Sequence, residues 1–220
     1  KFQENIKKQL NFYDITIDMY DQFVNFFNGK NYSPNTIGRH IKNLKAIMRA
    51  ARDEKLHTNV EIERKKFKTI KVETDQIYLN KDEVDRLYNL DLSDNPLLDI
   101  ARDVFLTGVY TAQRFSDYSR ITKDNIRKLR NGQKVIELIQ QKTGERITIP
   151  VHQNLDIILK KYNYTLPKTY EQKINERIKK VGEKAKINEK IQIEAIKGGL
   201  KVNKAYPRHD LIKTHTARRS

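Results

Sequence analysis

The chain has 220 residues, of which 37% are hydrophobic and 33% are charged, a size that suits one large domain or two small ones. Its 44 Lys and Arg residues against 28 Asp and Glu residues give a net charge of +16, which favours nucleic acid or another anionic partner, although a merely soluble basic protein would show the same balance. The sequence has no Cys, no apolar run long enough to span a membrane and no signal peptide in its polar first residues, which excludes disulfides, zinc fingers and membrane helices.

The first third of the chain has the hydrophobic periodicity of helices. One helix is predicted from a Thr16 cap to Gly29, and a second begins with Ser33 as N-cap and Pro34 as its first residue. This second helix has five basic residues and no acid as far as Arg52. A solvated basic face is one interpretation, and contact with DNA phosphates is the other. The candidates for that contact are Arg39, Lys42, Lys45 and Arg49.

A charged stretch from about Glu61 to Thr74 lacks periodicity and is predicted to be a flexible linker, with a domain boundary near Val72. Residues 1–72 would form a helical domain with its linker, and residues 73–220 a second domain. The first part has 15 basic and 8 acidic residues (net +7), and the second has 29 and 20 (net +9). Because both parts are basic, the arrangement suits a clamp around a duplex.

The second part is predicted to combine helices with β-hairpins. Helices are expected from a capping box at Asn80–Glu83, from Asn95-Pro96 onward, and over residues 155–162 and 170–185. Strands over 134–141 and 146–151 flank the turn Lys142-Thr143-Gly144-Glu145, and strands over 191–196 and 200–203 flank Gly198-Gly199. The fold class is therefore mainly α with a small antiparallel β-sheet.

Three places in this second part have side chains suited to a phosphate. Arg114 lies between an apolar helix and Ser116-Asp117, where its guanidinium could bind phosphate oxygens or pair structurally with Asp117. Lys142 lies at a hairpin tip, where most exposed lysines have no special role but a mobile cation can donate a proton. His215 and Arg218 share one face of a helix start capped by Thr214, which is either an anion site or a plain basic helix end.

Taken together and in this order, Arg114, Lys142 and His215-x-x-Arg218 resemble the tyrosine recombinase (phage integrase) family. The closest likeness is to integrases of mobile elements in Bacteroides-like bacteria, through residues 111–117 (Thr-Ala-Gln-Arg-Phe-Ser-Asp), Lys142-Thr143-Gly144 and residues 215–219 (His-Thr-Ala-Arg-Arg). The resemblance implies a core-binding, SAM-like DNA-binding domain over residues 1–72. It also implies a partial α+β catalytic domain over residues 73–220.

The resemblance also implies a mechanism without metal or cofactor. Arg114 and Arg218 would clamp the non-bridging phosphate oxygens, His215 would bind the phosphate and assist proton transfer, and Lys142 would be the general acid for the 5′ oxygen. A tyrosine would form a covalent link to DNA. The implied setting is double-stranded DNA in the bacterial cytoplasm, with a homo-tetramer on DNA as the assembly of the complete protein.

Two departures from the family pattern matter. Ala112 stands where the family has Gly, which would strain the backbone if φ is positive there. None of the eleven tyrosines follows Arg218, where the family has its nucleophile, so we expect a C-terminally truncated fragment that binds DNA and does not cut it. A non-catalytic DNA-binding module or regulator on the same fold is the alternative function. An RNA-binding protein that stacks bases on Tyr and Phe is a further one.

Overall fold

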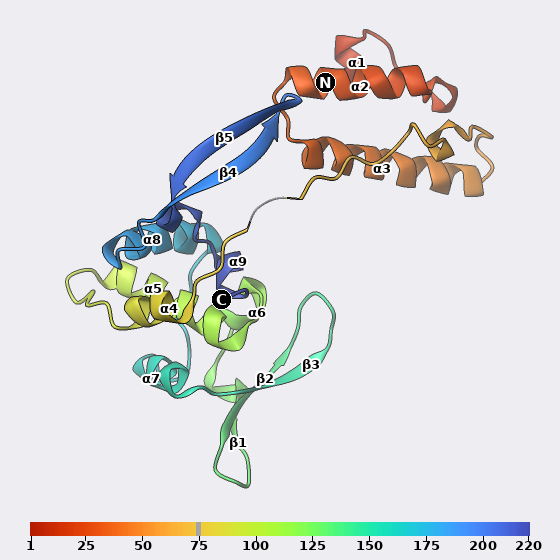
Figure 1. Ribbon diagram of the computed structural model, residues 1–220. Coiled ribbons are helices and arrows are strands. Elements are labelled where there is room, and N and C mark those ends of the chain that lie inside the picture. The colour runs from red at the N-terminus through yellow and green to blue at the C-terminus, as the bar shows by residue number, and fades with distance from the viewer. Residues whose placement is uncertain (74–75) are drawn as a thin grey trace. The chain divides into compact units, whose positions relative to one another are not determined.

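The computed structural model describes residues 1–73 and 76–220 and divides the chain into two compact units (Figure 1). The first unit comprises Lys1–Asp75 and Gln192–Lys204, and the second comprises Gln76–Ile191 and Ala205–Ser220. The predicted boundary near Val72 lies close to this division. The prediction placed residues 192–204 in the second domain, however, whereas they group with the first unit.

The first unit is built on helices α1 (Phe2–Asn5), α2 (Ile17–Gly29) and α3 (Pro34–Asp53), with short 3-10 turns at Phe12–Asp14 and Glu61–Glu63. Both predicted caps are present. The Thr16 hydroxyl accepts the Met19 amide at 3.2 Å, and the Ser33 hydroxyl accepts the Thr36 amide at 3.3 Å. The sequence therefore places the start of both long helices correctly.

The segment that follows α3 packs onto the helices and is not a free linker. Ile62 and Phe67 are buried in the same core as the apolar faces of α2 and α3. A Cβ atom on Gly38 would lie only 1.8 Å from the Ile70 carbonyl oxygen, so this segment packs directly on the α3 backbone. The predicted linker is wrong for residues 61–73, because two large apolar side chains anchor it; its last residue, Thr74, lies outside the described residues.

The second unit has helices α4 (Lys81–Tyr88), α5 (Pro96–Thr111), α6 (Phe115–Tyr118), α7 (Gln153–Lys161), α8 (Glu171–Lys184) and α9 (Thr214–Ala217). Strands β1 (Ile126–Lys128), β2 (Lys134–Ile139) and β3 (Arg146–Pro150) form an antiparallel sheet in which Ile136 pairs with Ile126 and Ile149. Strands β4 (Lys190–Lys197) and β5 (Leu200–Pro207) form a separate sheet, of which residues 192–204 group with the first unit. The predicted hairpins are confirmed, whereas β1 was not predicted, since three residues are too few to show alternation.

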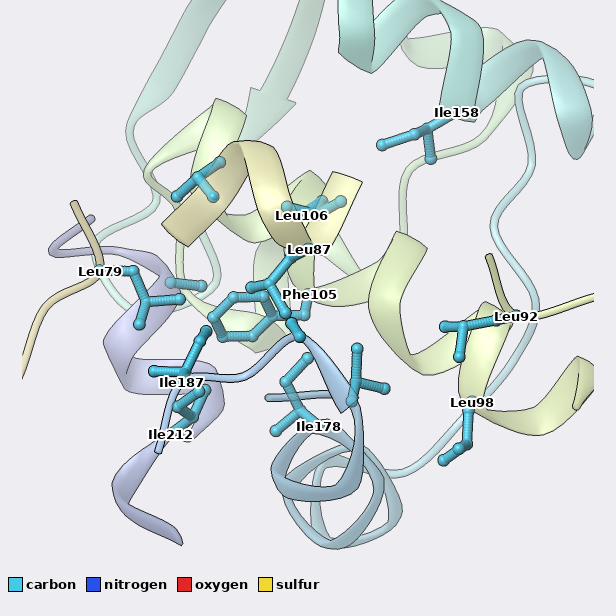
Figure 2. Close-up of a cluster of buried hydrophobic side chains, with 14 residues drawn as sticks. Leu79, Leu87, Leu92, Leu98, Phe105, Leu106, Ile158, Ile178, Ile187 and Ile212 are labelled. Atoms are coloured by element: carbon cyan, nitrogen blue, oxygen red, sulfur yellow. The ribbon is translucent and has the colours of Figure 1, made fainter. Parts of the chain in front are cut away.

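Helix α5 runs through the centre of the second unit. Phe105 and Leu106 lie in one buried cluster with Leu87 of α4, Ile178 of α8 and Ile212 (Figure 2). A second buried cluster joins α5 to the three-stranded sheet and α7, through Ala101, Val104, Ile136, Leu155 and Leu159. A helix that is packed into two buried clusters has little freedom to move, so the residues that follow its C-terminal end are held firmly.

These elements confirm the predicted fold class, which is mainly helical with small antiparallel sheets. Across residues 1–73 and 76–220, no helix combines the length and the apolar character needed to cross a bilayer.

Candidate active site

The turn that carries Arg114 begins where α5 ends. Ala112 ends the helix in the left-handed conformation, with φ 53° and ψ 22°, and its amide donates to the Gly108 carbonyl at 2.9 Å. Arg114 then adopts extended backbone angles and serves as the N-cap of α6. The expected backbone strain at Ala112 is therefore real, because a positive φ favours glycine.

Among residues 1–73 and 76–220, no hydrogen bond or ion pair reaches the guanidinium of Arg114. Its side chain is half-buried, and Nη1 is buried without a hydrogen-bond partner among the residues that the structure describes. The structural pairing with Asp117 that the sequence left open is not found among the described residues: Asp117 Oδ1 accepts the Gln141 amide at 2.9 Å, and Asp117 Oδ2 is also buried without a hydrogen-bond partner. Buried donors are nearly always paired, so an unpaired cationic donor marks a place where an anion would be stabilised.

Close packing fixes α6, and with it the position of Arg114. The Tyr118 ring is fully buried, and a Cβ atom on Gly108 would lie 2.7 Å from that ring, so only glycine lets α6 pack this tightly on α5. Burial raises the pKa of the Tyr118 phenol, and the nearby Glu171 carboxylate adds to the effect. Tyr118 therefore remains a neutral packing residue.

Lys142 lies in the exposed turn between β2 and β3. Two hydrogen bonds join this turn to the turn that carries Arg114. Besides the bond from the Gln141 amide to Asp117, Gln140 Nε2 donates to Gln113 Oε1 at 2.7 Å. The two hydrogen-bond partners of the turn are Gln113, the residue directly before Arg114, and Asp117, three residues after it. The structure thus brings Lys142 and Arg114 to the same part of the second unit.

His215 lies on α9 and Arg218 is its C-cap residue, and this helix packs against α5 and α8. Lys213 is the N-cap of this helix, and the predicted Thr214 cap is wrong. The hydroxyl of Thr214 instead donates to Glu171 on α8, and its amide donates to Asn175 Oδ1 at 2.8 Å. With Thr214 and Ala217 buried, His215 and Arg218 stay exposed and accessible to a ligand.

Glu171 on α8 interacts with the start of α9. Its carboxylate accepts the Thr214 hydroxyl, and its charge adds to the effect of burial in raising the pKa of Tyr118 on α6. In the described part of the chain, no hydrogen bond or ion pair joins Arg114, Lys142, His215 and Arg218 to one another. Two guanidinium groups, an ammonium and an imidazole are a donor set suited to a phosphate whose charge increases during reaction.

The four basic candidates on α3 fall into two pairs. Arg39 and Lys42 are exposed, whereas Lys45 donates to the Phe67 carbonyl at 2.8 Å and Arg49 holds Glu63 through two bonds of 2.8 and 2.9 Å. The Arg49 guanidinium lowers the pKa of Glu63 to about 2. Glu63, the acid that pairs with Arg49, lies outside α3, so the sequence pattern of the helix alone did not reveal this ion pair.

Comparisons with known proteins agree with this architecture. Residues 1–73 match the phage integrase SAM-like domain family, and no curated protein matches the chain. A lambda integrase dimer bound to a COC′ core site superposes with a TM-score of 0.64 and 18% identity, covering 94% of this chain and 71% of that one. A lambda integrase tetramer bound to a Holliday junction gives a TM-score of 0.61 and 19% identity, covering 94% and 58%.

The XerH site-specific recombinase bound to palindromic difH in a post-cleavage complex gives a TM-score of 0.62 and 13% identity, covering 99% of this chain and 62% of that chain. The chain thus spans between 58% and 71% of the length of these solved proteins. It has the same fold as these lambda integrase and XerH structures. More particularly, it combines that fold with an N-terminal phage integrase SAM-like domain.

Proposed function

We propose that this chain is the DNA-binding and phosphate-activating part of a site-specific DNA recombinase of the integrase type. The observation that carries the proposal is the buried, unpaired Nη1 of Arg114, at a turn bound to the Lys142 hairpin. The net charge of +16 supports a polyanionic substrate. The lambda integrase and XerH structures of the same fold are complexes with their DNA sites.

In the proposed reaction, Arg114 and Arg218 bind the non-bridging oxygens of one backbone phosphate. A tyrosine hydroxyl attacks the phosphorus and loses its proton, with His215 assisting that transfer. The bond from phosphorus to the 5′ oxygen breaks, and the Lys142 ammonium protonates the leaving oxygen. The phosphotyrosine bond keeps the energy needed for rejoining. Each such donor contributes roughly 10² to 10³ in rate. We assign the nucleophile to none of the eleven tyrosines in the chain.

The first unit would supply affinity through phosphates along the duplex. Arg39 and Lys42 are the candidates on α3 that are exposed and unpaired within the described residues. Lys45 and Arg49 would contribute only after leaving Phe67 and Glu63. Recombination joins two duplexes, so we also propose that several copies assemble on DNA, as in the lambda integrase tetramer on a Holliday junction.

The test uses the protein expressed from the complete reading frame and a duplex selected for binding from a random-sequence pool. A nick placed beside each candidate phosphate traps a covalent adduct, which denaturing electrophoresis detects. Arg114→Ala and Arg218→Ala should abolish the adduct, whereas Arg219→Ala, which alters the exposed neighbouring arginine, should retain it. Salt-sensitive DNA binding without any adduct would favour the non-catalytic DNA-binding module. An adduct that survives both substitutions would contradict the assignment.

A further inference from the structure

A relay of three side-chain hydrogen bonds runs from the end of α5 to the turn that carries Lys142. Gln113 Nε2 donates to the Thr111 carbonyl at 3.1 Å, and Gln113 Oε1 accepts from Gln140 Nε2 at 2.7 Å. Gln140 Oε1 in turn accepts from the Thr143 hydroxyl at 2.8 Å. The relay therefore starts at the last residue of α5 and ends at the residue directly after Lys142.

The relay has one direction, because each glutamine uses its donor on one side and its acceptor on the other. The Thr111 carbonyl requires a donor, so it orients the Gln113 amide and leaves Oε1 facing Gln140. Gln140 then presents its own oxygen to Thr143. A hydroxyl or amide of a different length at either position would leave a gap in the chain of bonds.

The hairpin turn needs such an anchor. Residues 141–146 are exposed, and backbone bonds between Gln140 and Gly144 or Glu145, each of 2.9 Å, close the turn. The Gln141 amide bond to Asp117 anchors the turn to α6, and the bond from Gln140 to Gln113 anchors it to the segment that follows α5. A lysine on a turn with no anchor would sample many positions, whereas proton donation requires a fixed one.

We propose that Gln113 and Gln140 are positioning residues that set Lys142 relative to Arg114. This inference rests on the proposed function for the role of Lys142, but the relay itself is testable without it. Neither glutamine touches the phosphate in this scheme. Their effect passes through the turn, so their loss should displace Lys142 and leave the Arg114 turn and the fold in place.

The first measurement is amide exchange by NMR on the 220-residue chain without DNA. In Gln113→Ala and in Gln140→Ala, the amides of Gln140 and Gly144 should exchange roughly three- to tenfold faster, the change expected for one lost hydrogen bond. Gln140→Glu keeps the size of the side chain and removes its donor, so it should behave like the alanine variant. Gln133→Ala, in the exposed turn between β1 and β2, is the matched control.

The second measurement is acetylation of Lys142, followed by mass spectrometry with and without saturating duplex DNA. In the wild type, a phosphate bound to the ammonium should protect Lys142. Gln113→Ala and Gln140→Ala should each lower this protection while DNA affinity stays within about threefold, since neither residue meets the phosphates. The double variant should lose no more than either single variant, because both break the same relay.

The outcomes separate the two proposals. Unchanged exchange at the turn in both alanine variants overturns the relay, and so does a Lys142 that DNA protects in the wild type and protects equally well in both variants. Faster exchange together with unprotected Lys142 in DNA-bound wild type supports the relay and contradicts the catalytic role of Lys142. A purely structural role would lower DNA affinity, or the stability of the whole unit, as much as the protection of Lys142, and would equally overturn the proposal.

Discussion

Replacement of Arg114 by methionine should stabilise the free chain while it weakens DNA binding. Nη1 of Arg114 is buried and has no partner within the described residues. A buried donor left without a partner costs about 1–3 kcal/mol, and because only one nitrogen of a half-buried side chain is affected, we expect the lower end, ~1 kcal/mol. Methionine fills a similar volume with an apolar chain and removes this cost.

The assay is thermal unfolding of Arg114→Met beside the wild type. A gain of about 1 kcal/mol corresponds to a rise in Tm of roughly 2–4 °C for a protein of this size. Arg130→Met is the control, since Arg130 is exposed in the turn between β1 and β2 and its loss should change stability by no more than about 0.5 kcal/mol.

The same variant should bind duplex DNA more weakly. If Arg114 meets a phosphate, its loss should lower the slope of log affinity against log salt by about 1. Stabilisation and weaker binding should therefore occur together in one variant. A drop in stability of more than about 1 kcal/mol would show that Arg114 is a structural residue, and an unchanged salt slope would show that no phosphate reaches it.

Three further predictions concern the backbone, pH and the first unit. Ala112→Gly should raise the free energy of unfolding by up to about 1 kcal/mol, because relief of the left-handed strain exceeds the added flexibility of the unfolded chain; denaturation that shows a loss would contradict it. The pKa of Glu63 is about 2 in the folded chain against 4.5 ordinarily, so its pairing with Arg49 stabilises the chain above pH 4.5 and is lost as pH falls towards 2. Glu63→Gln should flatten acid unfolding over that window, and an unaltered acid profile would refute the pairing. Arg39→Gln with Lys42→Gln should reduce the salt slope of duplex binding by about 2 without changing Tm, and an equal slope would remove α3 from the DNA interface.

The sequence predicted the long elements because their signals are local. Thr16, Ser33 and Asn80 each cap a helix as expected, and apolar periodicity located the faces that pack. The linker prediction failed because Ile62 and Phe67 lie in a charged, aperiodic stretch whose burial depends on helices far from it in the chain. Local patterns do not carry that tertiary information.

The candidate site was predictable only in part for the same reason. A motif located Arg114 and Lys142, but the partners that join their turns are polar residues without a local signature. Gln113 and Gln140 lie 27 positions apart by their numbering, yet they are hydrogen-bonded. No sequence pattern indicated Glu171 either, although its carboxylate accepts the Thr214 hydroxyl of α9 and its charge raises the pKa of Tyr118. Such pairings follow from the packing of α5, α6 and the sheet, which no short stretch of sequence contains.

The most direct test of the central claim is a binding cycle that pairs Arg114 with a single phosphate. Neutral methylphosphonates replace the phosphates of a selected duplex one at a time, and the affinity of each duplex is measured for the wild type and for Arg114→Met. If Arg114 binds a phosphate, neutralisation of that one phosphate should weaken binding by the wild type but barely affect the variant, because both changes remove the same contact. If the two changes add independently at every phosphate, Arg114 binds none of them and the proposed active site is contradicted.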